Sequence, residues 1–286
     1  MLRVAVFLAL FATPALSLDF QIFDGRRDAG PAPLVLVLHG GGGSGGQLRR
    51  QTGFDSAARR AGVVAVYPSA RFHLWNDGRF AATGNHRLAA KDDVGALRAL
   101  IDDLVTRGLA DPARVYVIGH SNGGGMAMRM ACTYPELLAG IAVVATKALL
   151  DVPCRRDPPI PAVFFMGTAD AVTPHQGDPD GRSGTPAADR ARTASGEATI
   201  ALWLKRNHCG SERRAETARG RETGIAVIRV EGRACAAPFR AFVIEGGGHT
   251  WPGAALFPRR AAARGEVRVT EISAAEEALR FWGLLR

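Results

Sequence analysis

Short apolar runs, separated by longer segments with helical spacing, are the feature that most constrains the fold of this chain. Six runs of four or five residues contain almost no polar side chain: 34–38, 63–66, 115–118, 141–144, 162–166 and 241–244. Such runs are typical of strands that are buried on both faces of a sheet. Between two of them, Val94, Leu97 and Ile101 recur at the spacing of one helix face, which predicts a helix at residues 91–107.

This alternation predicts an α/β fold in which a mostly parallel central sheet carries helices on both faces. Further helices are expected at residues 47–60, 126–134, 197–207 and 274–285, and one more strand at 225–230. Residues 170–195 and 253–265 are rich in Gly, Pro, Asp, Arg and Ala, so they are expected to be surface loops. Residues 18–286 are expected to form a single domain, with ligands binding beyond the carboxyl ends of the strands.

The first 17 residues have the pattern of a secretion signal. Arg3 supplies a positive charge, residues 4–12 are apolar, and Ala15 and Ser17 are small residues before the expected cleavage site. The apolar run is too short to span a bilayer stably. We therefore predict a signal peptide at residues 1–17 and a secreted or periplasmic protein without stable membrane insertion. An N-terminal anchor is the alternative.

Export predicts that the four cysteines form disulfides, because the compartments outside the cytosol are oxidising. Four cysteines allow three pairings, and proximity in the sequence favours Cys132 with Cys154 and Cys209 with Cys235. The chain has no C-x-x-C or H-x-x-x-H spacing, so no metal site is expected.

The chain is basic, with a formal net charge of +9, and only three of its 36 basic residues are lysines. The basic residues form scattered pairs rather than a long run interleaved with aromatic residues, so binding of nucleic acid is not predicted. A solvated, arginine-rich surface is the expectation. The sequence leaves the oligomeric state open.

The strongest chemical signal is the G-x-S-x-G pattern GHSNG at residues 119–123. It directly follows the apolar run that ends at Ile118 and directly precedes a predicted helix. A sharp strand-to-helix turn lifts the central side chain above the sheet, and glycines on either side avoid clashes with the neighbouring strand and helix. Ser121 is therefore the predicted nucleophile, and a chance glycine–serine loop is the alternative.

A serine hydroxyl is a weak nucleophile and needs a base. His249 lies in a glycine-rich segment just past the last predicted strand, and Asp170 follows the strand predicted at 162–166. The chain order Ser121, Asp170, His249 is that of α/β hydrolases, in which the carboxylate orients the imidazole. His39 is expected to support the glycine-rich loop instead. The other aspartates of these loops are expected to be solvated or turn-forming: Asp151, Asp157, Asp178 and Asp180.

Acyl transfer also needs N–H donors for the oxyanion of its tetrahedral intermediate. The backbone amide of Asn122, directly after the nucleophile, is one expected donor. The second is expected from the glycine-rich segment after residues 34–38, where Gly41 is favoured. A phosphate-binding loop is the alternative, but the segment lacks the G-x-x-x-x-G-K-[ST] pattern. No cofactor is expected.

Several segments together resemble one group of α/β hydrolases. They are HGGGGSGGQ, YPSA with a following WNDGR, DDVGALRALID, GHSNGGGM, MGTAD and GGGHTWPG. The combination is similar to the polyhydroxybutyrate depolymerase and feruloyl or acetylxylan esterase family, from about residue 34 to the C-terminus. The resemblance implies an α/β-hydrolase fold, hydrolysis of carboxylic esters, and the roles given above for Ser121, Asp170 and His249.

The same resemblance bears on residues beside the site. It implies that Trp251 lies near the substrate groove and that residues 75–77 form a wall or capping turn. Many members carry alanine after the nucleophile where this chain has Asn122, so the Asn122 side chain is expected to narrow the pocket. Polymer-degrading members often add a binding module, which makes soluble or oligomeric esters the expected substrates here.

The expected activity is that of a secreted serine carboxylic-ester hydrolase that forms an acyl-enzyme. Hydroxyalkanoate oligomers and feruloyl or acetyl esters are the expected substrates. A peptidase on the same scaffold is one alternative, and a non-catalytic secreted binding protein is another. The intact set of Ser121, Asp170 and His249 favours an enzyme.

Overall fold

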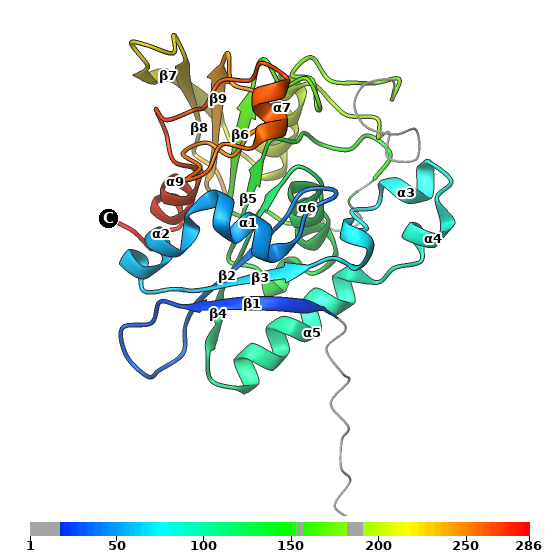
Figure 1. Cartoon of the computed structure of the whole chain (residues 1–286), viewed down its shortest axis with the longest axis vertical. Coiled ribbons are helices and arrows are strands. Elements are labelled where there is room, and N and C mark those ends of the chain that lie inside the picture. Colours follow the sequence, from blue (N-terminus) through cyan, green and yellow to red (C-terminus); the bar gives the residue numbers. More distant parts are fainter. Residues whose placement is uncertain (1–17, 153, 155–156, 182–190) are drawn as a thin grey trace, which may run out of the picture.

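A nine-stranded sheet forms the centre of the molecule (Figure 1). The computed structural model describes residues 18–152, 154, 157–181 and 191–286, so the predicted signal peptide lies outside the described residues. The strands are β1 (Asp19–Asp24), β2 (Ala32–Leu38), β3 (Val64–Ser69), β4 (Ala110–His120), β5 (Gly140–Val144), β6 (Ala162–Gly167), β7 (Ser211–Arg219), β8 (Ala226–Arg233) and β9 (Phe239–Glu245). Their order across the sheet is β1-β3-β2-β4-β5-β6-β9-β8-β7.

Most of this sheet is parallel. The strands from β3 through β2, β4, β5 and β6 to β9 run in one direction. The antiparallel pairings lie toward the two edges, where β1 pairs with β3, and β8 pairs with both β9 and β7. The mostly parallel α/β sheet predicted from the apolar runs is therefore confirmed.

Helices cover both faces of the sheet because side chains of a strand alternate in direction. The longer helices are α1 (Gly45–Thr52), α2 (Phe54–Ala61), α5 (Asp93–Thr106), α6 (Asn122–Thr133), α7 (Gly196–Arg206) and α9 (Ala274–Phe281). The short helices are α3 (Arg79–Ala82), α4 (His86–Ala89) and α8 (Arg259–Ala263), with 3-10 turns at Arg71–His73 and Pro135–Leu137.

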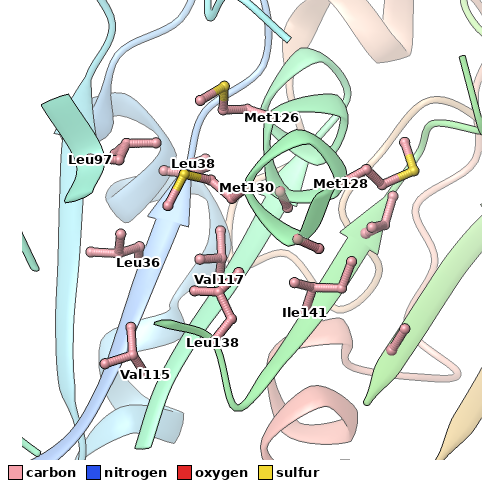
Figure 2. Close-up of a cluster of buried hydrophobic side chains, with 14 of the residues drawn as sticks. Leu36, Leu38, Leu97, Val115, Val117, Met126, Met128, Met130, Leu138 and Ile141 are labelled. Atoms are coloured by element: carbon pink, nitrogen blue, oxygen red, sulfur yellow. The ribbon is translucent and has the colours of Figure 1, made fainter. Parts of the chain in front are cut away.

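The two faces of β2 belong to two separate hydrophobic cores. Leu36 and Leu38 pack with residues of α5, α6 and α7, and Figure 2 shows them beside Leu97 and Met130. The alternate residue Val37 packs on the other face with residues of α1, α2 and α9. Each fully buried leucine or valine stabilises the fold by about 1.5–3 kcal/mol, so the apolar runs fix the sheet between its two helix layers.

Three expectations about secondary structure are corrected. The helix predicted at residues 47–60 is two helices, because Gly53 adopts a left-handed conformation, with φ of 64°, that ends α1. The edge strands β1 and β7 are not predicted, since both leave many side chains exposed and lack an apolar run. The segment 253–265, expected to be loop, contains the short helix α8.

The register of the parallel strands brings the predicted site segments to one edge. Leu38 at the end of β2 pairs with Gly119 of β4. Farther along the sheet, Gly167 at the end of β6 pairs with Ile244 of β9. The segments that follow these strands therefore lie at the same edge of the sheet.

Among the described residues, no helix has the length and apolar character needed to cross a bilayer.

Candidate active site

Ser121 lies at a sharp turn between β4 and α6. Its φ of 54° and ψ of −119° are unusual for a residue with a side chain, and its amide donates to the Val144 carbonyl at 2.7 Å. A Cβ on Gly119 would lie 2.0 Å from the Gly123 carbonyl oxygen, and one on Gly123 would lie 2.4 Å from the Leu38 carbonyl oxygen. Only glycine fits at both positions, so the chain can hold Ser121 in this strained conformation.

The imidazole of His249 is paired with the carboxylate of Asp170. The Nδ1 atom of His249 lies 3.1 Å from Asp170 Oδ1 and 3.0 Å from Oδ2. Asp170 itself is fixed by the turn that follows β6, because the amides of Val172 and Thr173 donate to Oδ1 at 2.9 and 2.7 Å. With Nδ1–H donating to the carboxylate, Nε2 of His249 is left as the basic nitrogen.

Burial alone would raise the pKa of Asp170. The nearby imidazole of His249 acts in the opposite direction, together with the charge of Lys147 and the Thr173 amide. These partners outweigh burial and hold the pKa of Asp170 well below its ordinary value. The carboxylate therefore stays ionised at neutral pH.

Ser121 and His249 line one cavity of about 580 Å³. The glycine-rich segment His39–Gly43 forms another part of its lining, together with apolar residues such as Phe72 and Val172. A cavity of this size holds a small-molecule ligand, and its mixed polar and apolar lining is typical of enzyme sites.

The glycine-rich segment approaches the start of α6. A Cβ on Gly41 would lie 3.9 Å from the Asn122 Cβ. The Gly42 and Gly43 amides already donate to carbonyls of His73 and Gly40. Within the described residues, the Gly41 and Asn122 amides have no such acceptor, so they remain open to a ligand. Backbone donors without an acceptor inside the protein are what stabilisation of an oxyanion requires.

The model of the α/β-hydrolase fold family matches residues 33–209 of this chain. The chain belongs to the α/β-hydrolase family. A solved structure with the same fold, an acetyl xylan esterase from Aspergillus awamori, superposes with a TM-score of 0.57 at 14% identity and covers 94% of this chain and 95% of its own.

Curated relatives of this α/β hydrolase are named as esterases and depolymerases. NocK of Nocardia uniformis subsp. tsuyamanensis, named as an esterase, is 34% identical over 87% of this chain and 73% of its own length. Feruloyl esterase B of Piromyces equi is 28% identical over 65% of this chain and 34% of its own. A poly(3-hydroxybutyrate) depolymerase of Ralstonia pickettii is 33% identical over 41% of this chain and 25% of its own. The α/β hydrolase described here is a carboxylic-ester hydrolase.

Asn122 belongs to the lining of the cavity, and the polar atoms of its side chain are bonded within the protein. Its Oδ1 accepts from the Trp75 amide at 2.7 Å, and its Nδ2 donates to the Trp75 carbonyl at 2.9 Å and to Asp77 Oδ2 at 3.0 Å. The indole of Trp75 in turn donates to the His39 carbonyl at 3.0 Å. These bonds hold the side chain in a buried network that ties α6 to the glycine-rich segment.

Trp251 is not brought to the cavity. Its side chain is buried in the hydrophobic core that contains α1, α2 and α9. Trp251 is absent from the residues that line the cavity in the described part of the chain. The expected position of Trp251 at the substrate groove is therefore corrected to a position in the core.

Two further histidines lie at the site and are neutral. Burial lowers the pKa of His39 to about 4, and its ring spans the Gly40 carbonyl at 2.8 Å and the Ala70 amide at 3.0 Å. Burial also lowers the pKa of His120 to about 3, and its ring lies 5.0 Å from that of His249. His39 thus supports the glycine-rich segment, as the sequence predicts.

Sequence reasoning missed the partners of Asp170. The Thr173 hydroxyl donates to Asp170 Oδ2 at 2.7 Å, and Lys147 Nζ lies 3.6 Å from the same oxygen. The spacing of Thr173 from Asp170 could have suggested this contact, because aspartate side chains often bond residues two or three positions later. Lys147 lies within the apolar segment 141–150, which could have suggested a buried lysine.

The hydrolase has both disulfides in the pairing that proximity favours. Cys132 of α6 pairs with Cys154, and Cys209 after α7 pairs with Cys235 between β8 and β9. Arg206 Nη1 lies 3.6 Å from both sulfurs of the first pair. The first disulfide anchors the C-terminal end of the helix that begins next to Ser121.

Proposed function

We propose that this chain is a secreted serine hydrolase of carboxylic esters that acts through an acyl-enzyme, with residues 18–286 as its catalytic domain. The observation that carries the proposal is the placement of Ser121, on its strained turn, in the same cavity as His249, whose imidazole is paired with the buried Asp170. Relatives named as esterases support the reaction class. The two disulfides and the N-terminal signal pattern support secretion.

In the first half of the proposed reaction, Ser121 Oγ attacks the ester carbonyl carbon while His249 Nε2 takes the hydroxyl proton. The Gly41 and Asn122 amides donate to the resulting oxyanion. The intermediate then collapses, the bond to the alcohol breaks, and the departing alkoxide takes the proton from His249. Asp170 remains ionised throughout and stabilises the imidazolium.

In the second half, water replaces the alcohol. His249 accepts a proton from this water as its oxygen attacks the acyl carbon, and returns the proton to Ser121 as the acid leaves. The reaction consumes one ester and one water and produces one acid and one alcohol. The groups that carry these steps all come from this chain.

The nucleophile is tested with Ser121→Ala and a short-chain p-nitrophenyl ester. We expect kcat to fall by about 10³- to 10⁶-fold with the fold intact. Ser56→Ala is the matched control, because Ser56 is exposed on α2 and lies outside the cavity lining. Wild-type protein, but not Ser121→Ala, should gain the mass of one fluorophosphonate group. Full activity in Ser121→Ala would overturn the mechanism.

For the substrate, we propose hydroxyalkanoate oligomers or feruloyl or acetyl esters, on the strength of the named relatives. Initial rates on hydroxybutyrate oligomers, feruloyl sugars, acetylated xylan and simple acyl esters would rank these classes by kcat/KM. A matched ester and amide pair in the same panel tests for peptidase activity. Faster cleavage of the amide would contradict the proposal.

A further inference from the structure

Lys147 is a buried charged residue that the mechanism above does not use. It follows β5 by three residues, in the apolar segment 141–150, and its side chain has no exposed surface. Ala145, directly after β5, has φ of 52°, which is a strained value for a residue with a side chain. The chain thus turns sharply at the point from which Lys147 enters the interior.

The contacts of Lys147 converge on Asp170 and its neighbour Thr173. The ammonium donates to the Thr173 carbonyl, and it lies 3.4 Å from Thr173 Oγ1 and 3.6 Å from Asp170 Oδ2. The Thr173 hydroxyl in turn donates to the same Oδ2. One carboxylate oxygen is therefore held by an ammonium and a hydroxyl, while His249 lies within hydrogen-bond distance of both oxygens.

A buried ammonium is costly, and an apolar residue of similar size often stabilises such a position better. Burial lowers the pKa of Lys147, and the Asp170 carboxylate opposes this effect. Asp170 already accepts two backbone amides, so it does not need the ammonium to be hydrogen-bonded. The presence of a charge at this position therefore points to a role in the chemistry of the pair formed by Asp170 and His249.

We propose that Lys147 is a positioning residue for catalysis, which keeps Asp170 aligned on His249 and offsets part of the negative charge that the imidazole faces. This inference rests on the proposed function. The ammonium offsets part of the negative charge of Asp170, so the imidazolium at position 249 is less stabilised than beside an isolated carboxylate. We therefore expect the acidic limb of kcat/KM to lie at lower pH with Lys147 than without it.

Other titratable groups face this network. His120 packs against the His249 ring, and Arg264 acts on His120 from a distance. Burial, followed by the charge of Lys147, lowers the pKa of His175, which Glu197 opposes. The carboxylate of Glu266, paired with Arg264, lies beside Gly248, the residue before His249, so Asp170, Lys147 and this pair are the charges around His249 to be considered.

The test is the pH dependence of kcat/KM in Lys147→Met, Lys147→Arg and Lys205→Met. Lys205 is exposed at the end of α7 and serves as the matched control. Removing the positive charge stabilises the imidazolium, so the acidic limb of Lys147→Met should move up by about 0.5–1 pH unit. Its plateau should fall by about 10- to 100-fold as Asp170 loses alignment. Lys147→Arg keeps the charge and should keep the limb.

A lower plateau with an unmoved limb in Lys147→Met would show a packing role only and overturn the inference. A limb that moves down would overturn it as well, because it means that Asp170 no longer faces His249. Activity in Ser121→Ala would instead overturn the proposed function. An inactive Ser121→Ala together with an unmoved limb in Lys147→Met would overturn only the role of Lys147.

A second measurement covers the case in which Lys147→Met fails to fold. Wild-type protein labelled with ¹⁵N-lysine has three Nζ signals, because the chain has three lysines. We expect the Lys147 signal to shift with an inflection at the pH of the acidic limb, as His249 becomes charged, and the Lys205 signal to lack it. A Lys147 signal without this inflection would overturn the inference.

Discussion

Two walls of the cavity differ in the groups that form them: one depends on charged side chains and the other on backbone amides. The base wall is formed by His249 and Thr173, which line the cavity, with the buried Asp170 and Lys147 behind them, and its contacts are charge-assisted. The glycine wall consists of residues 39–43, and it presents backbone amides supported by the neutral side chains of His39, Trp75 and Asn122. The charged pair Asp77–Arg79 lies behind this network, bonded to Asn122.

The difference follows from what each wall is proposed to do. A base changes its charge during turnover, so its neighbours must stabilise both its neutral and its protonated form. Donors for an oxyanion act best as fixed dipoles that need no rearrangement at the moment of reaction. We therefore expect changes in the base wall to affect rate and pH dependence most, and changes in the glycine wall to affect rate and stability together.

Among changes to the two walls, the largest effect is expected from the base wall, in Asp170→Asn. The amide can hold His249 in the wrong tautomer, so kcat should fall by about 10³- to 10⁴-fold with little change in KM. Steady-state kinetics on a soluble ester measures this. Asp102→Asn on the exposed face of α5 is the control. A loss below tenfold would mean that Asp170 does not orient the base.

A smaller loss of activity is expected from the glycine wall, in Asn122→Ala. The backbone donor is kept, but Trp75 loses partners for its amide and carbonyl. We expect kcat/KM to fall by about 10- to 100-fold and the free energy of unfolding by about 2–4 kcal/mol. Kinetics and urea titration would measure both. A loss of activity without a loss of stability would contradict the expectation that changes in the glycine wall affect both together.

Two buried histidines, His39 of the glycine wall and His120 next to the His249 ring, make stability depend on pH. The pKa values of His39 and His120 are lowered to about 4 and about 3, from 6.5 in the unfolded chain. The unfolded chain therefore binds protons first as pH falls. The contribution of the two neutral histidines to the free energy of unfolding is fully present above pH 6.5. It is lost as the pH falls toward the folded pKa values, by up to about 1.4 kcal/mol per pH unit for each histidine.

Urea titrations between pH 7 and pH 4.5 test this dependence. The free energy of unfolding should change less steeply with pH in His120→Gln than in the wild type, because one of the two histidines is gone. Below about pH 4, protonation of Asp170 should add to the loss, since its folded pKa lies below the unfolded value. A free energy of unfolding that does not change over this range would mean that neither histidine is neutral when folded.

The smallest effect is expected for Trp251→Phe, which belongs to neither wall. Because the indole is buried in the core, we expect kcat/KM to change by less than about threefold and the free energy of unfolding to fall by about 1–2 kcal/mol. A tenfold rise in KM with unchanged stability would show that Trp251 contacts the substrate after all.

The sequence predicts the elements whose physics is local. Residues 34–38 and 162–166 are apolar throughout because the finished strands are covered on both faces, and that pattern is visible without a structure. The spacing around Ser121 is equally visible, since the turn admits only glycine at positions 119 and 123. Both parts of the prediction depend on neighbours in the chain.

The sequence does not reveal contacts that depend on the third dimension. The apolar segment 141–150 suggests that Lys147 is buried, but it does not indicate that the ammonium lies 3.6 Å from Asp170 Oδ2. The Asn122 side chain is satisfied by a segment 47 positions away, which local spacing cannot indicate. Trp251 is placed wrongly because a tryptophan beside a base suits a groove and a core equally well by composition.

The burial of lysines has a practical consequence for attaching this protein to a surface. Lys147 is inaccessible, and the side chain of Lys91 is 9% exposed and paired with Asp93. Lys205 is left as the one exposed lysine side chain of the sequence. It lies outside the cavity lining in the described residues. Amine-directed coupling at mildly alkaline pH should therefore immobilise the protein through Lys205 or the α-amino group of the chain, which limits the molecules on a bead to two orientations.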